Sequence, residues 1–256
     1  MKIVFIGAGN LATRLGMALF AKGNEIIQVY SRTTESAKLL GEKVNAPYTD
    51  NIKQITPEAD LYIFSVKDDV LSGLLELIPS NKGLWVHTAG SIPMEVFYKH
   101  HNRFGVFYPL QTFSKHREVN FSVIPIYIEA KNTDDLTILK NLASTISDNV
   151  IEATSKQRKY LHVAAVFACN FTNHMYAIAA KLLEDKGLRF DQLLPLIDET
   201  AQKVHTLHPL DAQTGPAIRF DENVINRHLD MLIDEDLKKI YRLLSESIHE
   251  TAKKRI

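Results

Sequence analysis

The sequence has only one cysteine and no excess of positive or negative charge, which argues against a disulfide-bonded protein and against a nucleic-acid-binding one. A single cysteine cannot form a disulfide within the chain. Lys and Arg together number 30, and so do Asp and Glu, so no net charge attracts nucleic acid or an anionic membrane. The apolar run at the start of the chain reaches its first glycine too soon for a signal peptide or a membrane span. We therefore expect a cytoplasmic protein that binds neither nucleic acid nor a membrane.

The N-terminal stretch predicts a strand, a tight turn and a helix. The apolar run at residues 2–6 ends in Gly7-Ala8-Gly9, after which apolar residues recur with helical spacing. Gly7 permits a sharp turn, Gly9 has no side chain to keep a pyrophosphate from the backbone, and Ala12 lets the helix pack closely on the strand. The free N–H groups and positive dipole end of this helix would bind a diphosphate. The pattern favours dinucleotide binding over an ordinary strand-to-helix turn, with the cofactor at Gly7, Ala8, Gly9, Asn10, Leu11 and Ala12.

The residues after the second predicted strand, at 25–30, indicate which dinucleotide binds. NAD enzymes carry an Asp or Glu at this point for the ribose 2′-OH, and here no acid follows the strand. Ser31, Arg32 and Thr33 offer two hydroxyls and a guanidinium, which suit a 2′-phosphate. The sequence therefore predicts NADP(H). The alternative is that Ser31 and Arg32 begin a solvated turn and that Thr33 caps the next helix.

Strands and helices alternate as far as residue 153, which predicts an α/β fold with a doubly wound, Rossmann-like sheet. Further strands are expected at residues 60–66, 84–88 and 104–108, a weak one at 44–48, and two at 121–129 and 149–153 that flank a helix at about 133–147. Ligands bind beyond the carboxyl ends of the strands in such sheets. We therefore expect the nicotinamide to lie near Ser65, Val66, Lys67, Thr88 and Ser91.

The composition becomes helical from Thr154, so we expect a Rossmann-like domain at residues 1–153 and an all-helical substrate and dimerisation domain at residues 154–256. A long helix from Ser155 to about Lys186 begins the second domain.

Part of this helix, from Val163 to Cys169, is apolar around its whole circumference. A helix with this pattern is buried on all sides, and a domain of this size offers little to cover it. We therefore expect a second copy of the chain to pack against it as a homodimer. In that setting Cys169 is a small buried hydrophobic residue and not a nucleophile.

Five groups of residues resemble a known set of proteins: residues 7–12, 65–69, 108–113, 162–167 with Asn170, and 214–216 with Arg219, Asp221 and His228. The N-terminal half is similar to the NADP-binding domain of pyrroline-5-carboxylate reductases, ketopantoate reductases and β-hydroxyacid dehydrogenases. The chain as a whole resembles Rossmann-like NADP oxidoreductases with a C-terminal domain of the DUF2520 type. The resemblance implies the fold and the cofactor but no substrate. Tyr108 stands where this group has His, and Phe220 stands where it has Gly.

Polar residues in the long helix are candidates for the chemistry. His162, Asn170 and His174 are separated by multiples of four, which places them close to one face of a regular helix. A hydride-transfer enzyme needs a proton donor, and histidine titrates near neutral pH. We predict that His162 is the donor and that Asn170 orients the substrate. The alternative is that both are hydrogen-bonded core residues that fix helix packing.

Arg219 follows the break Thr214-Gly215-Pro216 and could bind an anionic group on the substrate, or it could be an exposed residue of a helix connection. His205 and His208 lack a third ligand in register, so no metal site is expected.

The sequence thus predicts an NADPH-dependent oxidoreductase that transfers hydride to a small carbonyl or imine, with an anionic group on the substrate. The alternative is a non-catalytic NADP(H)-binding sensor or scaffold whose domain angle responds to the nucleotide. A reductase needs a proton donor in the cleft, whereas a sensor does not.

Overall fold

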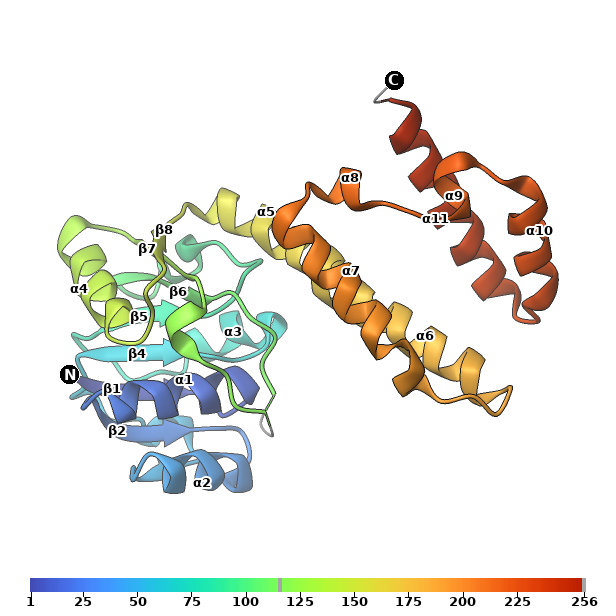
Figure 1. Ribbon diagram of the computed structural model, residues 1–256. Helices are drawn as coiled ribbons and strands as arrows, with labels where there is room; N and C mark the ends of the chain where they lie inside the picture. The colour runs from blue at the N-terminus through green and yellow to red at the C-terminus, as the bar shows by residue number, and fades with distance from the viewer. Residues whose placement is uncertain (115–116, 255–256) are drawn as a thin grey trace. The chain divides into compact units, whose positions relative to one another are not determined.

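The computed structural model describes residues 1–114 and 117–254, and the chain divides into two compact units, Met1–His174 and Met175–Ile256. The sheet lies in the first unit, and the described part of the second unit consists of helices and their connections (Figure 1). This arrangement confirms the predicted α/β fold class with helices in the C-terminal part. The expected domain division after residue 153 follows the last strand and stays a prediction, because the compact units divide inside a later helix.

The sheet has eight strands in the order β3-β2-β1-β4-β5-β6-β7-β8. The strands are β1 (Lys2–Ile6), β2 (Glu25–Tyr30), β3 (Tyr48–Thr49), β4 (Leu61–Phe64), β5 (Leu84–His87), β6 (Phe104–Pro109), β7 (Ile126–Ala130) and β8 (Val150–Glu152). Neighbours from β3 to β6 are parallel, whereas β7 is antiparallel to β6 and parallel to β8. The strand order reverses between β1 and β4, and in open sheets of this kind ligands bind at that crevice.

Helices connect the strands of the first unit and continue beyond the last one. They are α1 (Asn10–Ala21), α2 (Thr34–Lys43), α3 (Asp68–Leu75), α4 (Thr133–Ser144) and α5 (Ser155–Ala165), then a π-helical segment (Val166–Phe171) that leads into α6 (Thr172–Glu184). Short 3₁₀ turns lie at Ile52–Gln54, Met94–Phe97 and Phe121–Val123. The strand expected from residue 121 therefore begins only at Ile126, because Asn120 caps a 3₁₀ turn and Pro125 has no N–H for a ladder.

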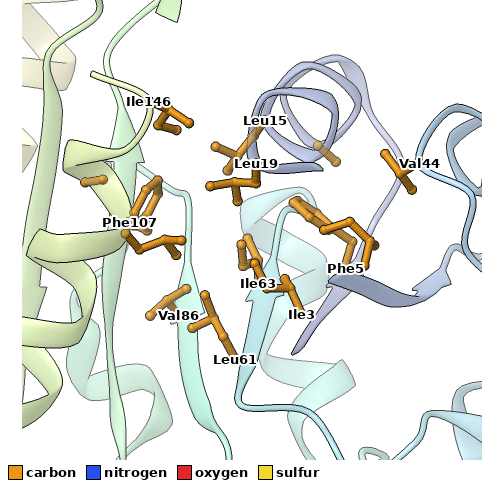
Figure 2. Packing of buried hydrophobic residues seen from close by; sticks show 14 of the residues in the cluster. Ile3, Phe5, Leu15, Leu19, Val44, Leu61, Ile63, Val86, Phe107 and Ile146 are labelled. Atoms are coloured by element: carbon orange, nitrogen blue, oxygen red, sulfur yellow. The ribbon is translucent and has the colours of Figure 1, made fainter. Parts of the chain in front are cut away.

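Both faces of the sheet are covered, as expected from the apolar strands. On the first face Ile3 and Phe5 of β1 pack under α1, and Figure 2 shows Leu15 and Leu19 of that helix over the strands. On the second face the core includes Val4, Ile6, Tyr62, Phe64, Trp85, Phe97 and Phe104. Because side chains alternate along a strand, His87 and Tyr108 share the face of Trp85 and Phe104.

The same alternation applies to β7. Ile126 and Ile128 belong to the core of the first face, so Tyr127 and Glu129 point to the second face. Helix α5 begins beside this polar pair, because the Ser155 N–H donates to Glu129 Oε1 at 2.8 Å. The start of α5 is therefore held against the second face of the sheet.

The second unit continues through the 3₁₀ turn Phe190–Leu193 to α7 (Leu194–Thr206), α8 (Pro209–Ala212), α9 (Pro216–Arg219), α10 (Glu222–Met231) and α11 (Glu235–Lys253). Helix α9 packs against α10 and α11, where Ala217, Ile225 and Leu229 are buried. Phe220 ends α9 with a φ of +52°, in the left-handed region that favours glycine, and its ring stacks on His249 with centroids 4.4 Å apart. None of the helices in the described ranges is long and apolar enough to cross a membrane.

Candidate functional site

Gly7 is required by the fold itself. Its φ is +109°, and a Cβ at this position would lie 2.1 Å from the Ser65 carbonyl oxygen at the end of β4. The Gly7 N–H donates to the Tyr30 carbonyl at the end of β2 at 2.8 Å. The turn after β1 thus lies against the neighbouring strands on both sides, and any side chain would force it away from them.

Gly9 differs, because no described atom would lie within 4 Å of a Cβ built on it and its φ of −75° suits any residue. The first turn of α1 has no acidic residue, and no described side chain caps its N terminus. Open space at a backbone without a side chain, beside the uncapped positive end of a helix, fits the diphosphate of a dinucleotide. The chain's own residues therefore fit NADP(H) at this turn.

The predicted 2′-phosphate residues follow β2, and Arg32 and Thr33 are exposed. Thr33 is the N-cap residue of α2, but among the described contacts its side chain makes no capping hydrogen bond. Asp50, at the end of neighbouring β3, accepts a hydrogen bond from the Thr34 hydroxyl. Burial raises the pKa of Tyr30, the Asp50 carboxylate raises it further, and Arg32 lowers it, so an acid and a base both lie near this site.

The residues expected near the nicotinamide lie along the carboxyl ends of β4 and β5. Ser65 and Val66 lie next to Gly7, and the Thr88 N–H donates to the Phe64 carbonyl at 3.1 Å. The Ser91 hydroxyl donates to Asp68 in the first turn of α3. Lys67, at the N-cap of α3, is exposed. These contacts bring the loops after the two strands together.

His162 of α5 lies beside these loops. Its Nδ1 is 3.2 Å from the Tyr108 hydroxyl at the end of β6, and the two rings meet edge to face. Gly90, after β5, lies so close that a Cβ on it would be 2.6 Å from His162 Nδ1. The imidazole is half-buried. A titratable side chain thus lies at the carboxyl ends of β5 and β6, next to residues 88–91.

Tyr108 is buried, and its surroundings determine its protonation. Burial raises the pKa of the phenol, Arg158 lowers it, and Tyr127 and Asp68 raise it. The net shift is upward, so the phenol keeps its proton at neutral pH. It can therefore donate to His162 Nδ1 when the imidazole is neutral.

His87, the last residue of β5, is hydrogen-bonded to the loop that follows the strand. It is fully buried, and its Nδ1 accepts the Ala89 N–H at 3.2 Å. Burial lowers the pKa of His87 to about 3, and the nearby charge of Arg158 contributes. The Pro93 carbonyl opposes this shift, although among the described residues no group makes a hydrogen bond of good geometry to His87 Nε2. His87 is thus a neutral structural histidine.

The other predicted catalytic residues are not assembled with His162 by any described contact. Asn170 is exposed in the π-helical segment, whose wider turn interrupts the regular spacing that placed it on the face of His162 and His174. Arg219 is exposed at the end of α9 in the second unit. Cys169 is exposed, so the expectation that it is a buried hydrophobic residue is wrong for the single chain, because nothing in the described residues covers this side of the helix.

Sequence reasoning missed three buried or partly buried residues around the site: Arg158, Glu129 and His87. Glu129 did carry a signal, because it interrupts the apolar alternation of β7. In residues 1–114 and 117–254, no group of three His, Cys, Asp or Glu side chains could hold a metal ion.

Two family models match the chain, one in its N-terminal part and one in its C-terminal part. Residues 2–86 match the family described as "NADP oxidoreductase coenzyme F420-dependent", and residues 124–248 match the "Domain of unknown function (DUF2520)". The chain is 58% identical to the "putative NADP oxidoreductase BF3122" of Bacteroides fragilis, with a TM-score of 0.92 over 97% of this chain and 98% of that one. None of the curated proteins compared with the chain is significantly similar to it.

Two more distant structures share the fold. An imine reductase of Streptomyces aurantiacus is 15% identical, with a TM-score of 0.68 over 99% of this chain and 95% of that one. A 1-pyrroline-5-carboxylate reductase of Streptococcus pyogenes is also 15% identical, with a TM-score of 0.64 over 99% of this chain and 98% of that one.

Proposed function

This chain belongs to the family of NADP oxidoreductases that includes the Bacteroides fragilis protein, and we propose that it is an NADPH-dependent reductase of a small carbonyl or imine. Family membership confirms the predicted resemblance and NADP(H) as the cofactor. The open backbone at Gly9 and the uncapped start of α1 support a diphosphate at this turn. When bound, NADPH supplies the hydride that reduces the substrate carbon.

The observation that carries the proposal is the position of His162 beside Tyr108 and Gly90. Reduction of a carbonyl or imine leaves negative charge on oxygen or nitrogen, which a proton donor must neutralise. In the imidazolium form of His162 both ring nitrogens carry a proton, and Nδ1–H donates to the Tyr108 oxygen; in the neutral form with the proton on Nε2, Nδ1 accepts from the Tyr108 hydroxyl. The imidazolium gives its Nε2 proton to the substrate, and the neutral imidazole that remains can accept a hydrogen bond from the Tyr108 hydroxyl at Nδ1.

Asn170 and Arg219 keep their proposed roles in orienting the substrate and binding an anionic group on it. Asn170 lies in the first unit, eight residues after His162, and Arg219 lies in the second unit. The apolar helix supports a dimer, since Val163 and Phe167 are 54% and 65% exposed in the single chain. Sedimentation that shows a stable monomer at micromolar concentration would contradict the dimer.

The test of the function is NADPH oxidation with a panel of small substrates. Cyclic imines come first, because the two more distant structures are named for imine or pyrroline carboxylate reduction, and keto acids and aldehydes follow. His162→Gln should lower turnover on any accepted substrate by about 10² or more, with NADPH affinity unchanged. NADPH binding without oxidation by any member of the panel would favour a sensor, and unchanged turnover in His162→Gln would exclude His162 as the donor.

A further inference from the structure

Arg158 is a buried charge one helical turn before His162. Its side chain is 1% exposed, and its Nη1 donates to Glu129 Oε2 at 2.6 Å. The remaining nitrogens also have acceptors: Nε donates to the Ala89 carbonyl, and Nη2 donates to the Ile92 carbonyl and to Ser155 Oγ. All three nitrogens of the guanidinium are thus used within the first unit.

The two backbone carbonyls that Arg158 binds flank Gly90 and Ser91. These are the residues that contact His162 and Asp68. The same loop is held at its far end by Ser155, whose hydroxyl accepts the Met94 N–H at 3.0 Å and donates to Glu129 at 2.7 Å. The loop after β5 is therefore attached to the first turn of α5 at three points.

Helix geometry couples this attachment to the imidazole. Arg158 and His162 are four residues apart, so they lie on the same side of α5 and about 6 Å apart along its axis. Fixing the loop to the helix at Arg158 places Gly90 against His162 at the next turn. The charge also reaches Tyr108 on β6, because Arg158 lowers the pKa of that phenol.

Burying an ion pair costs desolvation free energy that the attraction between the two charges often does not recover. Replacing both partners by apolar residues of similar volume is often neutral or stabilising, so stability alone gives little reason for this pair. An apolar side chain could not donate to the Ala89 and Ile92 carbonyls, whereas the planar guanidinium binds both of them and the carboxylate at once.

We propose that Arg158 is a positioning residue of the active site, which holds the loop Ala89–Ile92 on α5 so that Gly90 and Tyr108 fix the orientation of the His162 imidazole. The effect on turnover rests on the proposed reductase function, whereas the effect on the imidazole does not.

The decisive variant is Arg158→Met with Glu129→Met, which removes both charges and leaves neither unpaired. The first measurement is the ¹⁵N spectrum of the histidine rings, in which His162→Gln identifies the His162 signals. Wild type should show one tautomer, with the proton on Nε2, and the double variant should show a mixture of tautomers. On an accepted substrate, kcat should fall by up to about 100-fold with KM for NADPH unchanged.

The matched control is Lys140→Met with Glu152→Met, an exposed ion pair on α4 and β8 that should change none of these readouts. If the double variant does not fold, Arg158→Lys is measured instead. Lysine keeps the positive charge but lacks the planar guanidinium that binds both carbonyls, so it should show the same mixture of tautomers. A single Nε2–H tautomer in whichever folded variant is measured would overturn the proposal. Inactive wild type with the expected tautomer change would reject only the reductase function.

Discussion

Tyr108 and His162 are 54 residues apart in the chain, and the hydroxyl of one lies 3.2 Å from Nδ1 of the other. The contact joins the end of β6 to α5 and gives the two nitrogens of the imidazole different surroundings. Nδ1 of the histidine is thus occupied by the tyrosine, which stands at a position where similar proteins were expected to have histidine.

Tyr108→Phe should therefore impair turnover without affecting the cofactor. The phenyl ring fills the same space, but His162 Nδ1 loses its hydrogen-bond partner, which orients the imidazole. We expect kcat to fall about 10-fold or more, with the dissociation constant for NADPH unchanged by calorimetry. Tyr127→Phe is the control, since its ring lies 6.5 Å from that of Tyr108. Equal kcat for Tyr108→Phe and wild type would exclude a role for this hydrogen bond.

Gly9→Ala and Gly7→Ala should separate cofactor binding from folding. The methyl group at Gly9 enters open space, so the melting temperature should stay within a few degrees of wild type, whereas NADPH should bind about 10-fold more weakly or worse. At Gly7 the methyl group would overlap the Ser65 carbonyl, so this variant should be strongly destabilised. Thermal melting and calorimetric titration measure the two effects. Wild-type NADPH affinity in Gly9→Ala would place the diphosphate elsewhere.

His87 should make the protein sensitive to acid. Its pKa is about 3 in the folded chain and about 6.5 when unfolded, so between these values the unfolded state binds a proton that the folded state does not. This contribution to stability is complete above pH 6.5 and is lost as the pH falls, by about 1.4 kcal/mol for each pH unit.

His87→Asn tests this dependence, because the asparagine Oδ1 can accept the Ala89 N–H but does not titrate. Between pH 6 and pH 4 the variant should lose about 2 kcal/mol less free energy of unfolding than wild type does in urea denaturation. Exposed His100→Asn should keep the wild-type slope. The same slope in His87→Asn and wild type would show that His87 is protonated in the folded protein.

The parts of the fold with strong local patterns were predictable from sequence. The strand, turn and helix at residues 2–21, with Gly7 as the turn, follow from apolar periodicity and backbone freedom, which need no knowledge of distant residues. His162 was identified as a polar residue in an apolar helix, and it lies beside Tyr108 and Gly90; its role as the proton donor stays a prediction.

The contacts around that residue could not be predicted, because they join distant segments. Glu129 and Arg158 lie on different elements, and nothing in the sequence specifies that they pair. The short strand β3 was placed too early in the sequence, because its two residues are too few to show an apolar period. The π-helical segment has no marker in its composition, so the helical spacing assumed for Asn170 did not allow for it.

Arg158 and His162 are one helical turn apart, so the number of residues between them matters more than which residues those are. Inserting or deleting one residue between them would rotate the imidazole by about 100° around the helix axis and turn it away from Tyr108, although every side chain of the site would still be present. Residues 159–161, by contrast, need only continue the helix. When relatives of this protein are aligned, a gap in this turn is therefore stronger evidence for a change of activity than substitutions at those three positions.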